Sequence, residues 1–266
     1  MATATKPRNA AKTAAGKGTT IVTGASSGIG EEFGRQLAQR GYRVVLVARR
    51  RDRLEKLAQE IGDAEIIEAD LSTPSGVAAV EERIARGDID VLVNNAGFGT
   101  NGDFAELPLE RELEEIDLNV RALTQLSHAA LGPMKARRSG TIINVGSTGS
   151  FQPVPYMSTY AATKAYVLYF SEGLHEEAKA YGVTVTCLTP GPVKTEFQTV
   201  AGVDEKSLPA GWSTPRQVVK LALNAAKSGS AIAVPGMYNK ATANISRVAP
   251  RFMVRKISGR MFKKKE

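Results

Sequence analysis

The sequence predicts a single α/β domain in which one parallel sheet, of about seven strands, is covered by helices on both faces. From Thr19 onward, short and continuously apolar runs alternate with amphipathic stretches, which is the pattern of a doubly wound sheet buried on both sides. The length of 266 residues and the hydrophobic fraction of 42% suffice for one large core. No segment approaches the ~20 apolar residues that a membrane-spanning helix needs.

The individual elements follow from the hydrophobic periodicity. Apolar runs place strands at residues 19–23, 43–47, 64–68, 89–93, 141–145, 183–188 and 231–234. Amphipathic periodicity predicts helices at 28–40, 52–61, 73–86, 110–137 and 160–181, and one more after Thr214. The long irregular segment 196–213 is interpreted as a lid over a substrate, because long loops in compact domains are usually functional.

The two ends of the chain differ from the domain, which is expected to span residues 18–238. Residues 1–17 lack apolar periodicity, and they predict a disordered extension without the apolar core of a signal peptide. The net charge of +8 is concentrated at the ends, since residues 1–18 hold four cations and residues 247–266 hold eight. The body is slightly acidic, which argues against a nucleic-acid partner.

Residues 239–266 form a basic C-terminal extension. Large apolar residues alternate with cations over 245–257, and a run of three lysines begins at Lys263. Such a segment is a candidate for peripheral contact with an anionic membrane. A solvated helix with a disordered tail, or a contact between subunits, explains the pattern equally well.

The cysteine and histidine content excludes two classes of site. The one cysteine, Cys187, lies in an expected buried strand, which is compatible with a reducing, cytoplasmic location. His128 and His175 fall in helical patterns with no Cys, His or Asp cluster near them. We therefore expect no disulfide and no metal.

A glycine-rich loop connects the first strand to the first helix. Glycines at this position allow a tight turn and close approach of a pyrophosphate to the helix N-terminus. The strand before and the helix after the loop give the motif the context that dinucleotide binding requires. The candidate cofactor-binding residues of this loop are Gly24, Ser26, Ser27, Gly28, Ile29 and Gly30.

The end of the second strand indicates which dinucleotide is bound. An acid there would hold the ribose 2′-hydroxyl of NAD, whereas an arginine suits the 2′-phosphate of NADP. The chain reads Arg49-Arg50-Arg51 with no acid before Asp52. Arg49 is the best-placed cation, and Arg51 and Arg53 are interpreted as solvated. NADP(H) is therefore preferred, although NAD(H) can be accepted.

The third and fourth strands supply further cofactor contacts at their carboxyl ends. Asp70, followed by Leu71, could accept a hydrogen bond from the adenine amine. Asn95, Ala96 and Gly97 follow the fourth strand, and the alanine and glycine permit close approach to the adenosine half.

Tyr160 and Lys164 are a candidate acid–base pair, because residues four apart on a helix are neighbours. An ammonium near a phenol favours the phenolate and lowers its pKa. At ~4 Å and an effective dielectric of ~20 this effect is bounded at about three pKa units. The pair is a weak signal by itself, since most such pairs are ordinary neighbours on a helix surface.

The motifs together resemble the short-chain dehydrogenase/reductase family, over residues 18–236. They are Thr23-Gly24-x3-Gly28-x-Gly30, Asn94-Asn95-Ala96-Gly97, Asn119, Ser147, Tyr160-x3-Lys164 and Pro190-Gly191, with Ser147 at the family's usual thirteen residues before Tyr160. Residues 95–99 and 174–177 resemble a branch of bacterial reductases near the 3-ketoacyl-CoA reductase and 17β-hydroxysteroid dehydrogenase group. Gly146 departs from the family, which often has a serine there.

The resemblance implies a Rossmann-type fold, an NAD(P)-dependent enzyme and four catalytic residues. Tyr160 would exchange a proton with the substrate oxygen, Lys164 would lower the pKa of Tyr160 and bind the nicotinamide ribose, and Ser147 would position the substrate. Asn119 would hold a water that links Lys164 to solvent. Asn119 could instead only kink or cap a helix, and Ser150 could compete with Ser147.

The resemblance also implies a nicotinamide site and an oligomer. Pro190 and Gly191 follow the sixth strand, and the backbone of Val193 with the hydroxyl of Thr195 would hold the carboxamide. Family habit suggests a homodimer or homotetramer formed through the helix near 110–137 and the Tyr160 helix.

The expected substrate is a small, lipophilic ketone or aldehyde, or the corresponding alcohol. The predicted apolar wall comprises Phe151, Pro153, Val154, Met157, Phe197 and Trp212. A 3-oxoacyl thioester or steroid reductase of lipid metabolism is the alternative. A protein that binds NADP without catalysis is a remote third hypothesis, which the intact set of four catalytic residues disfavours.

Overall fold

The computed structural model describes residues 18–204, 208 and 211–263. The extension predicted at 1–17 therefore lies outside the described residues, as do the lysines after Lys263. Over the described residues, the predicted parallel sheet of seven strands is confirmed, in the order β3-β2-β1-β4-β5-β6-β7. The strands are β1 (Thr19–Thr23), β2 (Arg43–Ala48), β3 (Ala64–Glu68), β4 (Ile89–Asn94), β5 (Gly140–Val145), β6 (Val183–Leu188) and β7 (Ile232–Ala233).

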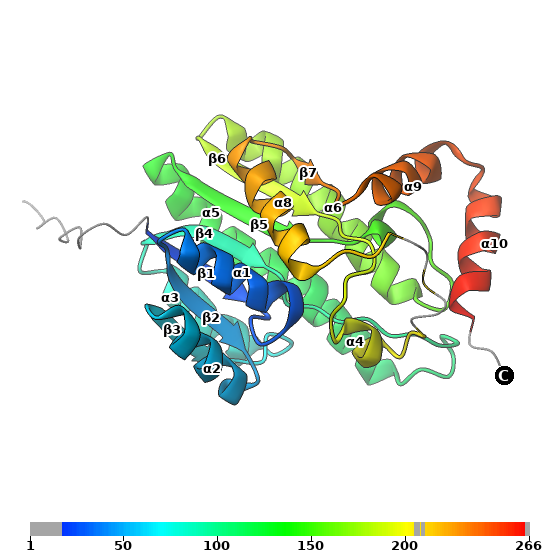
Figure 1. Ribbon diagram of the computed structural model, residues 1–266, viewed down its shortest axis with the longest axis horizontal. Coiled ribbons are helices and arrows are strands. Elements are labelled where there is room, and N and C mark those ends of the chain that lie inside the picture. Colours follow the sequence, from blue (N-terminus) through cyan, green and yellow to red (C-terminus); the bar gives the residue numbers. More distant parts are fainter. Residues whose placement is uncertain (1–17, 205–207, 209–210, 264–266) are drawn as a thin grey trace, which may run out of the picture.

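The sheet is doubly wound, because the chain builds it outward twice from the centre. It runs from β1 through β2 to the edge strand β3, crosses back to β4 beside β1, and continues outward to β7 (Figure 1). The order of strands thus reverses between β1 and β4. In such sheets ligands bind at the carboxyl ends of the strands next to this reversal.

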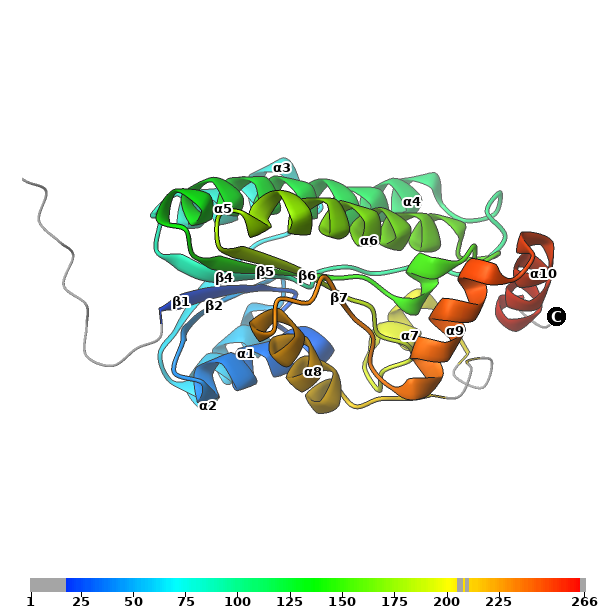
Figure 2. The same ribbon diagram turned by 90° about the horizontal axis from the view of Figure 1, so that it is seen from above.

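Helices cover both faces of the sheet, as the apolar strands predicted. Helices α1 (Gly28–Gln39), α2 (Arg51–Ile61) and α8 (Pro215–Lys227) lie on one face, and α3 (Pro74–Ile84), α5 (Leu123–Arg137) and α6 (Ser158–Lys179) on the other (Figure 2). Phe33 and Val219 are fully buried in the first layer, and Val80 in the second. The two cores hold the strand ends, and with them the loops, in fixed positions.

The predicted continuous helix at 110–137 is wrong in one respect. The structure has α4 (Leu109–Ile116), then a π-helical turn over Asp117–Ala122, and then α5. Asn119 lies in this wide turn, where its side chain accepts from Phe98 N at 3.2 Å and donates to Phe98 O at 2.9 Å. The turn therefore interrupts the helix where Asn119 clamps the chain that follows β4.

The C-terminal segment folds against the domain. Its two helices are α9 (Met237–Val248) and α10 (Arg251–Phe262), so the boundary expected after residue 238 falls inside a helix. Ser258 Oγ donates to Pro153 O at 3.1 Å, and Asn101 Nδ2 donates to Phe262 O at 3.1 Å. None of the described helices is long and apolar enough to cross a membrane.

Candidate active site

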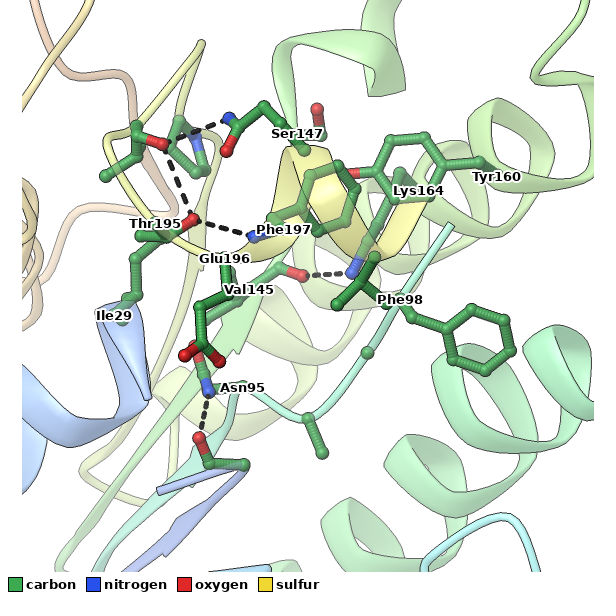
Figure 3. A pocket seen from close by; sticks show the side chains of 18 of the residues that line it. Ile29, Asn95, Phe98, Val145, Ser147, Tyr160, Lys164, Thr195, Glu196 and Phe197 are labelled. Carbon is green, nitrogen blue, oxygen red and sulfur yellow. Dashed lines mark hydrogen bonds between the residues drawn. The ribbon is translucent and has the colours of Figure 1, made fainter. Parts of the chain in front are cut away.

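A cavity of about 450 Å³ lies at the carboxyl ends of the strands, around the reversal between β1 and β4. The loops after β1, β2, β4, β5 and β6 all line it, and the C-terminal helix α10 reaches it as well. The strand-end motifs that are scattered through the sequence therefore meet in one place. The side chains along part of this cavity are drawn in Figure 3.

The glycine-rich loop forms the floor of the cavity. Gly24 and Gly28 adopt φ values of 65° and 58°, which favour glycine. A Cβ on Gly30 would lie 2.2 Å from Gly24 O, so a larger residue would push the loop away from α1. Of the loop residues predicted to bind cofactor, all but Gly30 line the cavity. The backbone and small side chains there fit a pyrophosphate at the N-terminus of α1.

The end of β4 holds the glycine-rich loop in place. Thr23 Oγ1 accepts hydrogen bonds from Asn95 N at 2.9 Å and Ala96 N at 3.0 Å. In return Asn95 Nδ2 donates to Thr23 O at 2.9 Å. Asn95, Ala96 and Gly97 all line the cavity. The predicted adenosine-side residues therefore also orient the loop that would receive the pyrophosphate.

Two arginines line the cavity at the end of β2, not one. Arg49 is 60% exposed and lies 3.5 Å from Asp70 Oδ2 and 3.7 Å from Glu114 Oε1. Arg50 Nε donates to Ser26 Oγ at 3.2 Å, and its NH1 donates to Glu196 Oε2 at 2.9 Å. The argument that assigned Arg49 to the 2′-phosphate of NADP therefore applies equally to Arg50. The contact with Glu196 could not be predicted, because it joins residues 146 apart in the chain.

The acidic residues near these arginines already form hydrogen bonds or ion pairs. Asp70 accepts from Ser72 Oγ at 2.7 Å, and it does not line the cavity, although Leu71 does. This hydrogen bond and the nearby Arg49 keep the pKa of the Asp70 carboxyl low despite partial burial. Arg53 is not simply solvated as expected, because it binds Glu196 at 2.6 Å. Glu196 thus connects the segment after β6 to the second strand–helix turn.

Ser147, Tyr160 and Lys164 meet on the opposite wall (Figure 3). Ser147 follows β5, and Tyr160 and Lys164 stand in the first turns of α6. Lys164 Nζ donates to Val145 O at 2.9 Å and lies 5.8 Å from the centre of the Tyr160 ring. The four-residue spacing of Tyr160 and Lys164 was weak evidence in the sequence, but in the structure these two side chains do lie close together beside the cavity.

The structure separates Ser147 from its competitor Ser150. Ser147 lines the cavity, whereas Ser150 is buried below it and donates to Lys164 O at 2.7 Å. Asn119 is also buried outside the cavity, where its amide donates to Thr163 Oγ1 at 3.1 Å as well as to Phe98 O. The observed contacts of Asn119 are those of a residue that positions the backbone around Tyr160 and Lys164.

The titration of the pair differs from the expectation. Burial raises the pKa of the Tyr160 phenol to about 12, although the adjacent Ser147 hydroxyl acts in the opposite direction. Burial also lowers the pKa of Lys164 to about 8. Desolvation of the phenol is the largest effect on its pKa, so Tyr160 does not show the expected net lowering, and the contribution of Lys164 stays a prediction. Tyr160 is protonated at neutral pH.

The segment after β6 closes one end of the cavity, where the nicotinamide site is predicted. Pro190, Gly191, Val193 and Thr195 line it. Val193 O accepts from Gln198 Nε2 at 3.0 Å, and Thr195 Oγ1 accepts from Phe197 N at 3.3 Å. These bonds place α7 (Phe197–Ala201) directly over Tyr160, and the rings of Phe197 and Tyr160 are 5.3 Å apart.

The apolar wall contains some of the predicted residues and several others. Val154, Met157 and Phe197 line the cavity as expected. Phe151 does not, because it packs into a core cluster around Leu168. Trp212 instead lines a separate hollow with Arg35, Arg53 and Arg216, and Pro153 contributes its carbonyl to α10.

Two residues of the wall come from the C-terminal helix. Met261 and Phe262 line the cavity, and Phe262 packs with Val154 and Phe197 in one apolar cluster. The alternation of apolar and basic residues in this segment suggested a surface contact and gave no sign of an inward face. The structure thus adds α10 to the wall that would surround a substrate.

Residues 18–206 match the sequence profile of the family described as short chain dehydrogenase. The chain is 38% identical over 196 residues to an NADP-dependent 3-hydroxy acid dehydrogenase from Salmonella typhi, covering 70% of this chain and 78% of that protein. It is 32% identical over 194 residues to hydroxysteroid dehydrogenase-like protein 1 from Gallus gallus. That match covers 70% of this chain but only 59% of the relative. A very-long-chain 3-oxoacyl-CoA reductase from Anas platyrhynchos is also 32% identical over 194 residues, with 68% of this chain and 61% of that protein covered.

Two solved structures are similar over most of the chain. A short-chain dehydrogenase from Sphingobium yanoikuyae in complex with NADPH is 33% identical, with a TM-score of 0.79 over 88% of this chain and 97% of that one. A bulky-bulky ketone specific alcohol dehydrogenase from Comamonas testosteroni is 28% identical, with a TM-score of 0.75 over 89% and 96%.

Proposed function

Because the chain belongs to the short chain dehydrogenase family of oxidoreductases, we propose that it interconverts a lipophilic carbonyl compound and its alcohol with NADP(H). The observation that carries the proposal is the position of Tyr160. Tyr160 lines the same cavity as the glycine-rich loop and the apolar residues Phe197 and Phe262, and its ring centre lies 5.3 Å from that of Phe197.

The residues of the chain would bind the cofactor, orient the substrate and protonate the substrate oxygen. A bound NADP(H) supplies the hydride chemistry at its nicotinamide ring. Ser147 donates a hydrogen bond to the carbonyl oxygen and holds it beside Tyr160. During reduction, the phenol of Tyr160 delivers its proton to that oxygen, and its pKa of about 12 keeps it in the protonated form that this step needs. Lys164 would bind the nicotinamide ribose.

The arginine pair after β2 supports the preference for NADP(H). Two guanidinium groups line the cavity there without an acid in the same loop before Asp52. Guanidinium forks match the oxygens of a phosphate, whereas a ribose hydroxyl calls for an acceptor. The relative from Salmonella typhi and the structure from Sphingobium yanoikuyae bear the same cofactor in their names. NAD(H) would bind the same loop without the 2′-phosphate contacts.

Replacing Arg49 and Arg50 together with alanine should lower kcat/KM for NADPH by about 10²–10⁴-fold, because hydrogen bonds to charged groups contribute ~1.5–3 kcal/mol each. The value for NADH should fall much less, because only the contacts of Arg50 with Ser26 and Glu196 are lost. Arg51→Ala is the matched control, since Arg51 is 61% exposed and pairs with Glu55 at 2.8 Å. Initial rates with both cofactors measure the effect. Equal losses for NADPH and NADH would contradict the assignment of the phosphate site.

The apolar lining favours a lipophilic ketone or aldehyde. Val154, Met157 and Phe197 form one side of the wall, with Met261 and Phe262 from α10. The similarity to an enzyme named for bulky ketones agrees with such a wall. A 3-oxoacyl thioester or steroid is the second candidate, and the similarity to the 3-oxoacyl-CoA reductase and hydroxysteroid dehydrogenase-like proteins favours it.

Phe262→Ala should raise KM for a bulky aryl ketone by about tenfold, because ~1.4 kcal/mol of apolar contact is lost. The KM for a small ketone such as acetone should change much less. Phe252→Ala is the control on the same helix, since Phe252 is 64% exposed and does not line the cavity. Steady-state kinetics with the two ketones provide the test. An unchanged KM for the bulky ketone would remove α10 from the substrate wall.

Oxidation of NADPH across ketones, aldehydes, steroids and 3-oxoacyl thioesters tests the function itself. The highest kcat/KM for a free ketone would support the leading proposal, and the highest for a thioester would favour the second candidate. A chain that binds NADPH and turns over none of these substrates would indicate the remote alternative, a cofactor-binding protein without catalysis.

We also propose that the chain forms a homodimer or homotetramer through α4 and α6. These helices expose a group of large apolar side chains, namely Leu109, Leu113, Ile116, Tyr166 and Tyr169. Burial of such a surface between copies would remove apolar area from water. Light scattering at increasing ionic strength measures the state, and a monomer at micromolar concentration would contradict the proposal.

A further inference from the structure

The outer surface of α9 and α10 combines large apolar side chains with cations. We call the exposed residues of 237–263 the C-terminal surface. Its exposed apolar residues are Met237, Tyr238, Ile245, Val248, Phe252, Met253 and Ile257. Its exposed cations are Lys240, Arg251, Arg255, Lys256, Arg260 and Lys263. The sequence from 237 to 263 contains no aspartate or glutamate.

The charges of this surface are not neutralised within the domain. Elsewhere, cations such as Arg35, Arg53 and Arg83 lie 2.6–2.9 Å from carboxylates. Over the part of the chain that the structure describes, no ion pair is formed by Lys240, Arg251, Arg255, Lys256, Arg260 or Lys263. The surface therefore presents a large excess of positive charge, with Asp103 as the acid that lines a hollow beside Arg255 and Lys256.

The C-terminal surface is the outside of the substrate wall. The inner side of α10 carries Met261 and Phe262 into the cavity and ties Ser258 to Pro153 O. The outer residues of the same helix belong to the C-terminal surface. Figure 2 places α9 and α10 together at the end of the molecule beyond the carboxyl ends of the strands. The same helix α10 thus lines the cavity with Met261 and Phe262 and contributes to the C-terminal surface.

We propose that the C-terminal surface docks on an anionic lipid bilayer. Cations would meet anionic headgroups while Phe252, Met253 and Ile257 enter the boundary between headgroups and acyl chains. Charge complementarity selects this partner. A second copy would bring two positive surfaces with no acid together, and a nucleic acid would leave the exposed apolar residues without a function.

Docking in this orientation would place the substrate cavity next to the bilayer. A ketone dissolved in the membrane would then have a short path to Tyr160, a consequence that rests on the proposed function. The docking itself requires no catalysis. Its test is therefore independent of the reaction, and failure of the assay for carbonyl reduction leaves the docking result unaffected.

Sedimentation with vesicles tests the proposal. The full chain is mixed with vesicles of phosphatidylcholine alone, or with about one third phosphatidylglycerol, at an ionic strength of about 0.1 M. We expect partitioning at least about tenfold stronger to the anionic vesicles. The double variant Arg255→Glu, Lys256→Glu should lose this preference. Its matched control is Lys179→Glu, Lys227→Glu, on the last turns of α6 and α8, and should retain it.

The apolar contribution is tested separately. Phe252→Ser with Ile257→Ser should weaken binding to anionic vesicles by about tenfold, whereas Tyr181→Ser, at an exposed position after α6 and outside the proposed subunit contact, should not. Binding that is equal for neutral and anionic vesicles, absent for both, or equally affected in test and control variants would overturn the proposal. Self-association that depends on Arg255 and Lys256 without vesicle binding would assign the surface to a second copy instead.

Discussion

Replacement of Tyr160 with phenylalanine is expected to lower kcat for carbonyl reduction by about 10²–10⁴-fold, which is the usual contribution of general acid catalysis. The variant retains the ring, and with it the 5.3 Å contact to Phe197, so NADPH affinity and thermal stability should change little. Single-turnover rates and NADPH fluorescence titration separate the two effects. Tyr166→Phe is the control on the same helix, because its hydroxyl contacts Thr124 at 2.9 Å, away from the cavity.

The pH dependence provides a second readout of the same residue. Since the pKa of Tyr160 is raised to about 12, the phenol remains a proton donor throughout the neutral range, and reduction should be maintained there. Alcohol oxidation needs the phenolate, so its rate should rise with pH. A reduction rate unaffected by Tyr160→Phe, with the same pH profile as the native chain, would show that another group supplies the proton.

Replacement of Glu115 with glutamine should stabilise the protein at pH 8 and have little effect at pH 4.5. Glu115 is fully buried in α4, and its Oε2 accepts from Thr100 Oγ1 at 3.0 Å. Within the described part of the chain, its Oε1 has no hydrogen-bond partner. The Thr100 hydroxyl also donates to Glu112 Oε1 at 2.5 Å, so two carboxyl groups share one hydroxyl.

Burial raises the pKa of Glu115 from 4.5 to about 7. The folded state therefore binds the proton more tightly than the unfolded state, and the free energy of unfolding falls as pH rises from about 4.5 to 7. The shift corresponds to about 3 kcal/mol. Glutamine stays neutral and should abolish this fall, giving a difference between variant and native chain that grows to about 3 kcal/mol by pH 8.

Urea unfolding between pH 4.5 and 8 measures that difference. Titration of the other groups is common to both chains and largely cancels in the comparison. Glu115→Met, which is also uncharged, should reproduce the pH-independent behaviour even if its packing changes the absolute stability. A difference that stays constant over this range would show that Glu115 does not carry the buried charge.

Local patterns were sufficient to predict the sheet and most of the site. The seven strands are apolar runs, and the loops after them are fixed to one edge by the parallel topology. It can therefore be predicted, without knowing any tertiary contact, that Gly24, Asn95, Ser147 and Tyr160 lie close together. The failures concern features that depend on such contacts. The π-helical turn at Asn119 is associated with the backbone of Phe98, which is distant in sequence, and Phe151 was assigned to the cavity although it packs into the core.

The position of α10 and the pKa of Tyr160 were beyond the reach of sequence for related reasons. Apolar residues at 261 and 262 look like the end of a basic tail until the helix is seen to bond to Pro153 and Asn101. The spacing of Tyr160 and Lys164 indicates their proximity, but it does not report the burial that dominates their titration. Desolvation is a property of the assembled cavity.

The ion pair between Arg50 and Glu196 would make the proposed cofactor site and the proposed substrate site energetically interdependent. Arg50 lies where a 2′-phosphate would bind, and Glu196 immediately precedes α7, which stands over Tyr160. A phosphate that draws Arg50 away weakens its hold on that segment. By reciprocity, a substrate that moves the segment must change the affinity for NADPH by the same factor by which NADPH changes the affinity for substrate. Glu196→Gln should reduce this factor toward one, as measured by NADPH titration with and without a bound alcohol.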